Sequence, residues 1–122
     1  MRSRRMNKAQ VVGLTRSLAY RLAKRGEAIT VNTVCPALVL IGLIPADIAK
    51  KVPQEFITPS ATVVRAVESF IADQSLTGQV VECSGQELFY HPTPTFSNPG
   101  TEWVMTGGVK RILDEHAKTN GK

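Results

Sequence analysis

The sequence predicts an α/β domain with a small parallel sheet, on three observations. An amphipathic helical pattern ends at Gly26, and a β-branched segment follows within about two residues, an order typical of the αβ half of a βαβ unit. A second helical pattern begins at Pro59 and again leads into a short apolar segment. The chain has 122 residues, 43% hydrophobic and 20% charged, which is a globular composition and enough for one ordinary domain.

Residues 8–25 are predicted to form the first helix. Its apolar positions recur at the spacing of one helical face: Val11, Leu14, Leu18 and Leu22, widened by Val12, Ala19 and Ala23. Gly26 lies where a C-terminal cap is expected, and Lys24 and Arg25 suit the negative end of the helix dipole.

Residues 28–35 predict a strand, because this segment is short, rich in β-branched side chains and followed by Pro36. A loop follows, in which residues 46–51 are expected to form a short helix. Thr58 is the expected N-cap of the second long helix and Pro59 its first residue. Residues 79–83 predict another strand, which a turn at residues 84–85 closes.

From residue 87 to residue 108 the chain is rich in proline and glycine, and a loop segment is expected. Its aromatic residues could line a substrate pocket or pin the loop to the core: Phe89, Tyr90, Phe96 and Trp103. Residues 110–118 are expected to form a short terminal helix. The prediction is thus a folded unit over residues 1–86 and a loop-rich aromatic tail over residues 87–122.

Basic residues are concentrated at the start of the chain. The net charge is +5, but residues 1–26 hold eight basic side chains and no acidic one, so the remainder has a net charge of −3. This segment has three interpretations: a solvated helix edge, a nucleic-acid or membrane patch, or a mitochondrial matrix presequence. We favour the first, because a helix of the fold explains the periodicity without targeting.

Neither a membrane span nor a secreted scaffold is expected. The longest uncharged stretch, residues 28–46, is interrupted by Asn32, Pro36 and Pro45. Two cysteines in a chain of this size do not make a disulfide framework, and no glycosylation acceptor site is present. We expect a cytoplasmic protein, with the mitochondrial matrix as the alternative, and no nucleic-acid or membrane partner.

Several blocks of sequence, in order, resemble the second half of a short-chain dehydrogenase/reductase. They are Lys8-Ala-x-Val-Val-Gly-Leu-Thr-Arg-Ser-Leu-Ala, Leu22-Ala-Lys-x-Gly26, Ile29-Thr-Val-Asn-x-Val-Cys-Pro36 and Leu76-Thr-Gly-Gln-Val-Val81. The resemblance covers roughly residues 4–85, and the aromatic tail is closest to the hydroxyprostaglandin-dehydrogenase-like members. It implies that residues 1–86 are the C-terminal half of a doubly wound, Rossmann-like parallel sheet that uses NAD or NADP on an alcohol or ketone substrate.

The resemblance also implies site residues. The family's catalytic lysine falls on Lys8, which would favour a tyrosinate and hold the nicotinamide ribose, but Arg4 occupies the tyrosine position. The segment after the strand would contact the cofactor through Pro36, Ala37, Val39 and Ile41. Ala37 replaces the family's glycine and Ile41 its threonine, so these contacts are expected to be impoverished. Lys8 is otherwise an exposed cation at the start of a helix.

The 122 residues contain no glycine-rich turn before a helix, where the family binds the pyrophosphate. We therefore expect weak or no cofactor binding and no turnover by this chain alone. The alternative function is a non-catalytic interaction module that dimerises through residues 8–25, with itself or with a full-length relative.

The remaining chemically active residues have plain structural explanations. Tyr20-Arg-Leu-Ala-Lys24 also fits a Tyr-x-x-x-Lys pattern, but it lies at the wrong end of its helix. Cys35 and Cys83 are expected at the ends of neighbouring strands as small buried residues, with a redox pair as the alternative. His91 and His116 lack metal-ligand spacing, so no metal site is predicted.

Overall fold

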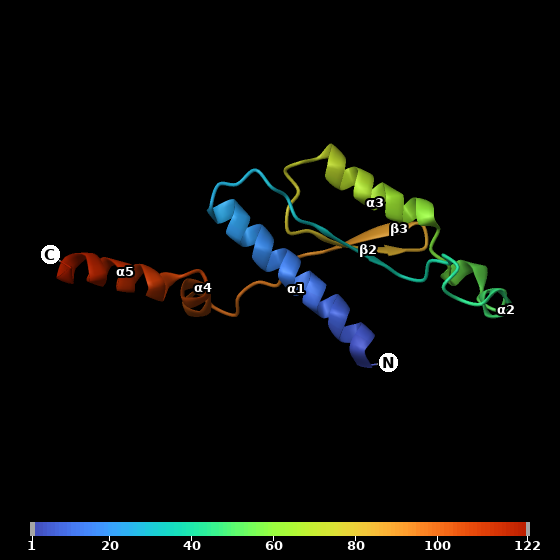
Figure 1. The fold of residues 1–122 in the computed structure, drawn as a ribbon, viewed down its shortest axis with the longest axis horizontal. Helices are drawn as coiled ribbons and strands as arrows, with labels where there is room; N and C mark the ends of the chain where they lie inside the picture. Colours follow the sequence, from blue (N-terminus) through green and yellow to red (C-terminus); the bar gives the residue numbers. More distant parts are fainter. Residues whose placement is uncertain (1, 122) are drawn as a thin grey trace.

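The computed structural model describes residues 2–121, and the side chains of residues 9–121. Its elements in chain order are α1 (Arg2–Lys24), β1 (Thr33–Pro36), α2 (Ala46–Ala49), the 3-10 turn η1 (Gln54–Phe56), α3 (Ser60–Ala72), β2 (Val80–Ser84), β3 (Glu87–His91), α4 (Pro99–Met105) and α5 (Gly108–Asn120). Figure 1 shows α1 and α3 against the sheet, while α4 and α5 extend away from it. The predicted α/β fold class is confirmed.

The described strands form one mixed sheet in the order β1-β2-β3. β1 and β2 are parallel, with Thr33 beside Val80, and α3 is the crossover between them. β3 returns antiparallel to β2, with His91 beside Val80. Successive side chains of a strand point to opposite faces, so the two helices cover different sides of the sheet. Thr33 contacts α1 through Thr15, whereas Val34 packs on the side of α3.

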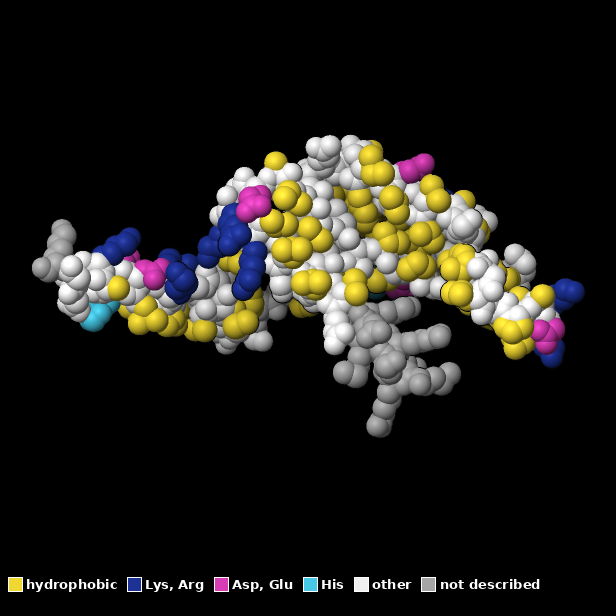
Figure 2. All heavy atoms as spheres, in the orientation of Figure 1, with side chains coloured by type: hydrophobic (Ala, Val, Ile, Leu, Met, Phe, Trp, Pro, Cys, Tyr) yellow, Lys and Arg dark blue, Asp and Glu magenta, His cyan; other side chains and the backbone are white. Residues whose placement is uncertain are grey.

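The core is small and lies between α3 and the sheet. Its buried centre is Ala66 of α3 with Val81 and Cys83 of β2. Partly buried hydrophobic side chains surround this centre: Val34, Val63, Phe70 and Leu88. Many large apolar side chains remain exposed, and Figure 2 shows them gathered over the central body and along α5.

Helix α1 ends as predicted. Gly26 has a φ of +70°, its amide donates to Ala23 O, and the amide of Glu27 donates to Leu22 O. This pair of hydrogen bonds is a Schellman cap, which needs a left-handed residue and so favours glycine.

The face that α1 turns to the sheet differs from its apolar stripe. Thr15 and Ala19 are buried, while Val11 is 51% and Leu14 66% exposed. The helix and the turn at Gly78 approach closely on this face: a Cβ added to Gly78 would lie only 3.3 Å from the Cβ of Ala19, a tight contact.

The strand expected over residues 28–35 begins only at Thr33, although the segment before it is also anchored. The amide of Val31 donates to Thr77 Oγ1, and the amide of Gly78 donates to Val31 O. The Asn32 side chain donates to Leu76 O at 2.8 Å and accepts from the amide of Gln79 at 3.0 Å. Side-chain hydrogen bonds thus replace the regular ladder at this end of the sheet.

Two other expectations about local structure are wrong. Helix α3 begins at Ser60 with Pro59 as the N-cap, and Thr58 caps nothing, because its hydroxyl accepts from the amide of Gly85 instead. The region 87–108 is not a continuous loop, since it contains β3 and α4. The cap of α4 is Asn98, whose side chain accepts from the amide of Thr101.

Candidate functional site

The candidate site is the backbone that follows the carboxyl end of β1. Pro36 ends the strand, and the amide of Ala37 still donates to Cys83 O at 2.9 Å, which continues the ladder by one residue. Leu38 O then accepts from the amide of Thr58 at 2.7 Å. These two bonds hold the first residues of the loop at the end of the sheet, where ligands bind in open α/β folds.

Beyond Leu38 the loop is free to meet a ligand. The amide and carbonyl of Val39 have no hydrogen-bond partner among the described residues, and the side chain is half-buried. Ile41 is 66% exposed, and other apolar side chains of the same loop region are exposed as well: Leu43, Ile48 and Phe56. The segment therefore offers backbone donor and acceptor groups beside an apolar surface, which suits the amide edge and the ring of a planar heterocycle.

Lys8 lies in α1, but its side chain is outside the described residues, as is that of Arg4. Figure 1 shows that α1 crosses the strands obliquely, and the assignment of Lys8 to the site stays a prediction.

Two buried threonines, Thr58 and Thr62, support this site. Thr58 Oγ1 accepts from the amide of Gly85 at 3.0 Å, and Thr62 Oγ1 donates to Gly85 O at 2.8 Å. Arg65 adds a bond to Gln86 O at 2.6 Å. The start of α3 therefore holds the β2–β3 turn and positions the loop end at Thr58. No local sequence signal points to this arrangement, because the threonines lie 27 and 23 residues before Gly85.

A histidine–glutamate pair on the α1 side of the sheet was also not predicted. His91 Nε2 lies 2.8 Å from Glu82 Oε2 across β2 and β3, and both side chains are about half exposed. Arg16 donates to the carbonyls of His91 and Pro92, which ties α1 to the end of β3. Exposed pairs of this kind contribute little to stability, so this cluster orients β3 rather than holding the fold together.

The two cysteines lie on adjacent strands, as predicted. Cys35 is beside Glu82 and Pro36 is beside Cys83, so the two thiols point to opposite faces of the sheet and both are free. Burial raises the pKa of the Cys83 thiol, and the nearby Cys35 adds to the rise. This arrangement supports the interpretation as small buried residues over the redox pair.

Tyr20 and Lys24 pack on each other at the far end of α1. Lys24 Nζ lies 5.8 Å from the centroid of the Tyr20 ring, a cation–π contact one turn before Gly26. This contact gives Tyr20 and Lys24 a structural role, and both residues are remote from the loop after β1.

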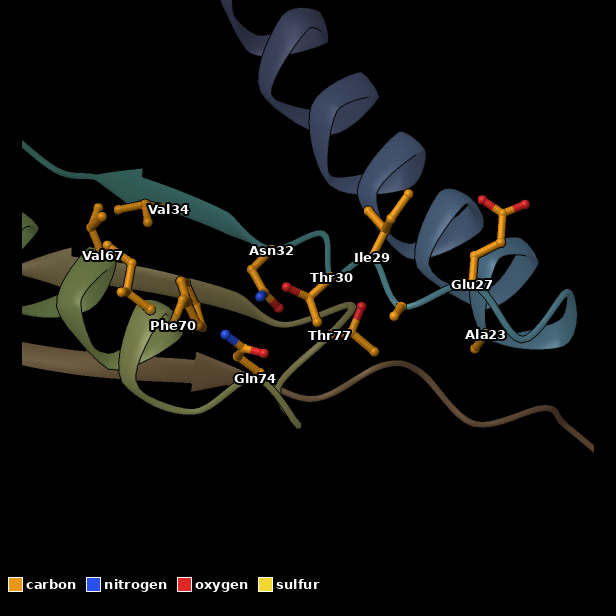
Figure 3. A pocket seen from close by; sticks show the side chains of 12 residues that line it. Ala23, Glu27, Ile29, Thr30, Asn32, Val34, Val67, Phe70, Gln74 and Thr77 are labelled. Carbon is orange, nitrogen blue, oxygen red and sulfur yellow. The ribbon is translucent and has the colours of Figure 1, made fainter.

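A groove of about 780 Å³ runs between residues 27–34 and the last turns of α3. Figure 3 shows Val34, Val67 and Phe70 at one end, and Asn32, Thr30, Gln74 and Thr77 in the middle. The groove follows the free edge of β1 and is separate from the loop at residues 36–41.

Among the described residues no three histidine, cysteine or acidic side chains cluster in a way that could hold a metal ion. Within the same part of the chain, no helix combines the length and the apolar character needed to cross a bilayer.

The sequence is similar to two curated proteins. It is 36% identical over 78 residues to the short-chain dehydrogenase/reductase prx6 of Penicillium rubens, a match that covers 63% of this chain and 26% of that protein. It is 34% identical over 96 residues to the 3-oxoacyl-(acyl-carrier-protein) reductase FabG of Rickettsia conorii, covering 67% of this chain and 37% of that protein. The chain thus spans between about a quarter and two fifths of the length of these relatives. No family model matches it.

Proposed function

Because the chain corresponds in sequence to part of a short-chain dehydrogenase/reductase, we propose that it contributes the nicotinamide end of an NAD(P)-linked oxidoreductase that acts on a hydroxyl or carbonyl group. The observation that carries this proposal is the anchored loop at the end of β1, with the free backbone of Val39 between a fixed Leu38 and the exposed Ile41. The cytoplasmic location remains a prediction.

The residues present fit one end of the cofactor. Backbone groups at Pro36, Ala37 and Val39 could hold the carboxamide edge, and the side chain of Ile41 offers an apolar wall for the ring. By the resemblance, Lys8 would hold the ribose. A bound nicotinamide would supply the hydride chemistry; the chain's own contribution is to orient the ring.

The other end of the cofactor has no counterpart in the described residues. The pyrophosphate of a dinucleotide binds at a helix N-terminus entered by a glycine-rich turn. Helix α3 is instead entered through Pro59, and its first turn is occupied by Thr58, Thr62 and the β2–β3 turn. The proposal therefore assigns no complete reaction to this chain alone, and Arg4 at the tyrosine position points the same way, because it stays protonated.

The test is cofactor binding and turnover by the purified chain. We expect no dissociation constant tighter than about 1 mM for NAD or NADP, a free energy near −4 kcal/mol. Oxidation of a panel of secondary alcohols, followed by cofactor absorbance, should not exceed the rate of a buffer blank. A micromolar dissociation constant in calorimetry, or measurable turnover, would overturn the expected inactivity.

A second function is favoured by α1: a non-catalytic module that dimerises through this helix. The stripe of Val11, Leu14 and Leu18 is 51%, 66% and 38% exposed and faces away from the sheet. Apolar rows of this kind on a helix are typical of helix–helix interfaces.

Sedimentation separates this function from the first. Leu14→Asp should shift the chain toward monomer, whereas Ser17→Asp, an exposed position on the same helix, should leave its sedimentation unchanged. A wild-type chain that is monomeric at about 100 µM, well above the dissociation constants of stable dimers, would rule out self-association through α1.

A further inference from the structure

We propose that a pocket between α1, the turn before β2 and the segment after β3 binds a phosphate group, either as the free ion or on a small ester. This Arg16 pocket has a volume of about 220 Å³. Its polar lining residues come from all three segments: Arg16, Tyr20, Thr77, Gln79 and Thr93. None of residues 36–41 lines it, so the proposal does not depend on the oxidoreductase function.

Arg16 is the cation of this pocket. Figure 1 shows the chain after β3 passing α1 before it reaches α4, and Arg16 Nη2 joins the two by donating to Pro92 O at 3.2 Å and His91 O at 3.5 Å. Nε is buried without a hydrogen-bond partner among residues 9–121, and Nη1 makes no hydrogen bond within the same range. A half-buried cation with unpaired donors is costly, so an anion that pairs with Arg16 recovers part of this cost.

The charges around the pocket favour an anion. Of the described residues that line it, Arg16 alone is charged, and no carboxylate in that part of the chain pairs with it. Glu82, on the same side of the sheet, pairs with His91 instead. Lys24 adds positive charge nearby, with its Nζ 5.8 Å from the centroid of the Tyr20 ring. A hollow lined by one sign of charge concentrates ions of the other sign.

The neutral side chains favour a tetrahedral anion. Tyr20, Gln79 and Thr93 each carry a hydrogen-bond donor, and none of these three side chains has a partner among the residues that the structure describes. Together with Arg16 they present donors from three separate segments. A phosphate group offers at least three strong acceptor oxygens, whereas a carboxylate offers two. A water occupies about 30 Å³ in the liquid, so the pocket has room for such an ion with part of its hydration shell.

The test is a titration of the isotope-labelled chain with sodium phosphate, followed by the NMR shifts of its backbone amides. Sodium chloride keeps the ionic strength constant. We expect a dissociation constant of about 1 mM, with the largest shifts at Gly78, Gln79 and Thr93. Sodium acetate at the same concentrations should leave these amides unchanged.

Phenyl phosphate in a parallel titration distinguishes the two sources of the phosphate group. Tighter binding than that of sodium phosphate would assign the pocket to a phosphate ester. Equal or weaker binding would assign it to the free ion. Both results require the shifts at Gly78, Gln79 and Thr93, so both support the proposal.

Matched variants of α1 place the binding in the pocket. Arg16→Gln should raise the dissociation constant for phosphate about tenfold or more, because a charge-assisted hydrogen bond is lost. Arg21→Gln removes an exposed cation of the same helix that does not line the pocket, and it should leave the constant unchanged. Tyr20→Phe removes one hydroxyl and should weaken binding roughly threefold, which keeps the test valid if Arg16→Gln does not fold.

Three results would overturn the proposal. Equal weakening by Arg16→Gln and Arg21→Gln would show that phosphate responds to net charge alone. Acetate that binds as tightly as phosphate would remove the case for a tetrahedral anion. Unchanged amides at Gly78, Gln79 and Thr93 would show that the pocket is not a binding site.

Discussion

At the scale of single residues, the two thiols differ in burial, and we expect them to differ in reactivity. Cys83 is fully buried against Ala66, and burial raises the pKa of its thiol, so the reactive thiolate is scarce and shielded. Cys35 is half-buried at the edge of the sheet. The two residues lie on neighbouring strands but on opposite faces.

We predict that iodoacetamide at pH 8 labels Cys35 at least about tenfold faster than Cys83, because the thiolate is the nucleophile and access limits its reaction. Peptide mass spectrometry over time gives both rates in one sample. Labelling in denaturant is the control, and there the two rates should converge. Equal rates in the native chain would contradict the burial of Cys83.

The same scale shows what a sequence can and cannot predict about the site. Gly26 was predictable because helices commonly end in a left-handed residue, and glycine adopts that conformation without strain. The contact of Ala19 with Gly78 and the capture of the Gly85 backbone by Thr58 were not, because they join residues 59 and 27 positions apart. The choice of Pro36–Ile41 as site residues rests on the resemblance and stays a prediction, whereas the unpaired backbone of Val39 is visible only in the structure.

At the scale of elements, α4 and α5 meet at a close contact. Trp103 packs on Gly108, where an added Cβ would lie 2.2 Å from two atoms of the indole ring. Gly108 is buried, whereas most apolar side chains of the two helices are exposed, among them Met105, Ile112 and Leu113. The angle between the helices therefore depends on the absence of a side chain at residue 108.

We predict that Gly108→Ala displaces Trp103, because a separation of 2.2 Å cannot be relieved without moving the ring. Trp103 is the single tryptophan, so its fluorescence emission should shift to longer wavelength as the ring becomes more exposed. Gly13→Ala is the control, since an added Cβ there meets nothing within 4 Å and alanine favours a helix. An unchanged spectrum in Gly108→Ala would show that the helix pair does not rest on this contact.

The sequence predicted the helices and strands whose ends are marked by local features such as periodicity, a cap or a turn residue. The order α1, β1, α3, β2 follows from periodicity, Gly26 and Pro59. β3 and α4 were expected to be loop, because prolines and glycines surround them, yet β3 gains its hydrogen bonds from β2 and α4 uses Pro99 at its first turn. The exposed side of α1 could not be predicted, since the close contact of Ala19 with the turn at Gly78 joins residues far apart in sequence.

At the scale of the whole molecule, exposed surface is the dominant property. Only five hydrophobic side chains are buried among the described residues: Ala19, Ala66, Val80, Val81 and Cys83. Three apolar surfaces are therefore exposed, namely the stripe of α1, the groove beside β1 and the apolar side of α4 and α5. Each has its own residues, so each can be altered alone.

The hydrogen bonds of Asn32 have a consequence for the order of folding. This side chain joins Leu76 and Gln79, which are 44 and 47 residues away in sequence. Closing a loop of this length costs about 3 kcal/mol or more in chain entropy, and the hydrogen bonds between the parallel strands form only after it is closed. The helices can form within microseconds from local contacts. We therefore expect the rate-limiting step of folding to be the pairing of the segment around Asn32 with residues 76–79.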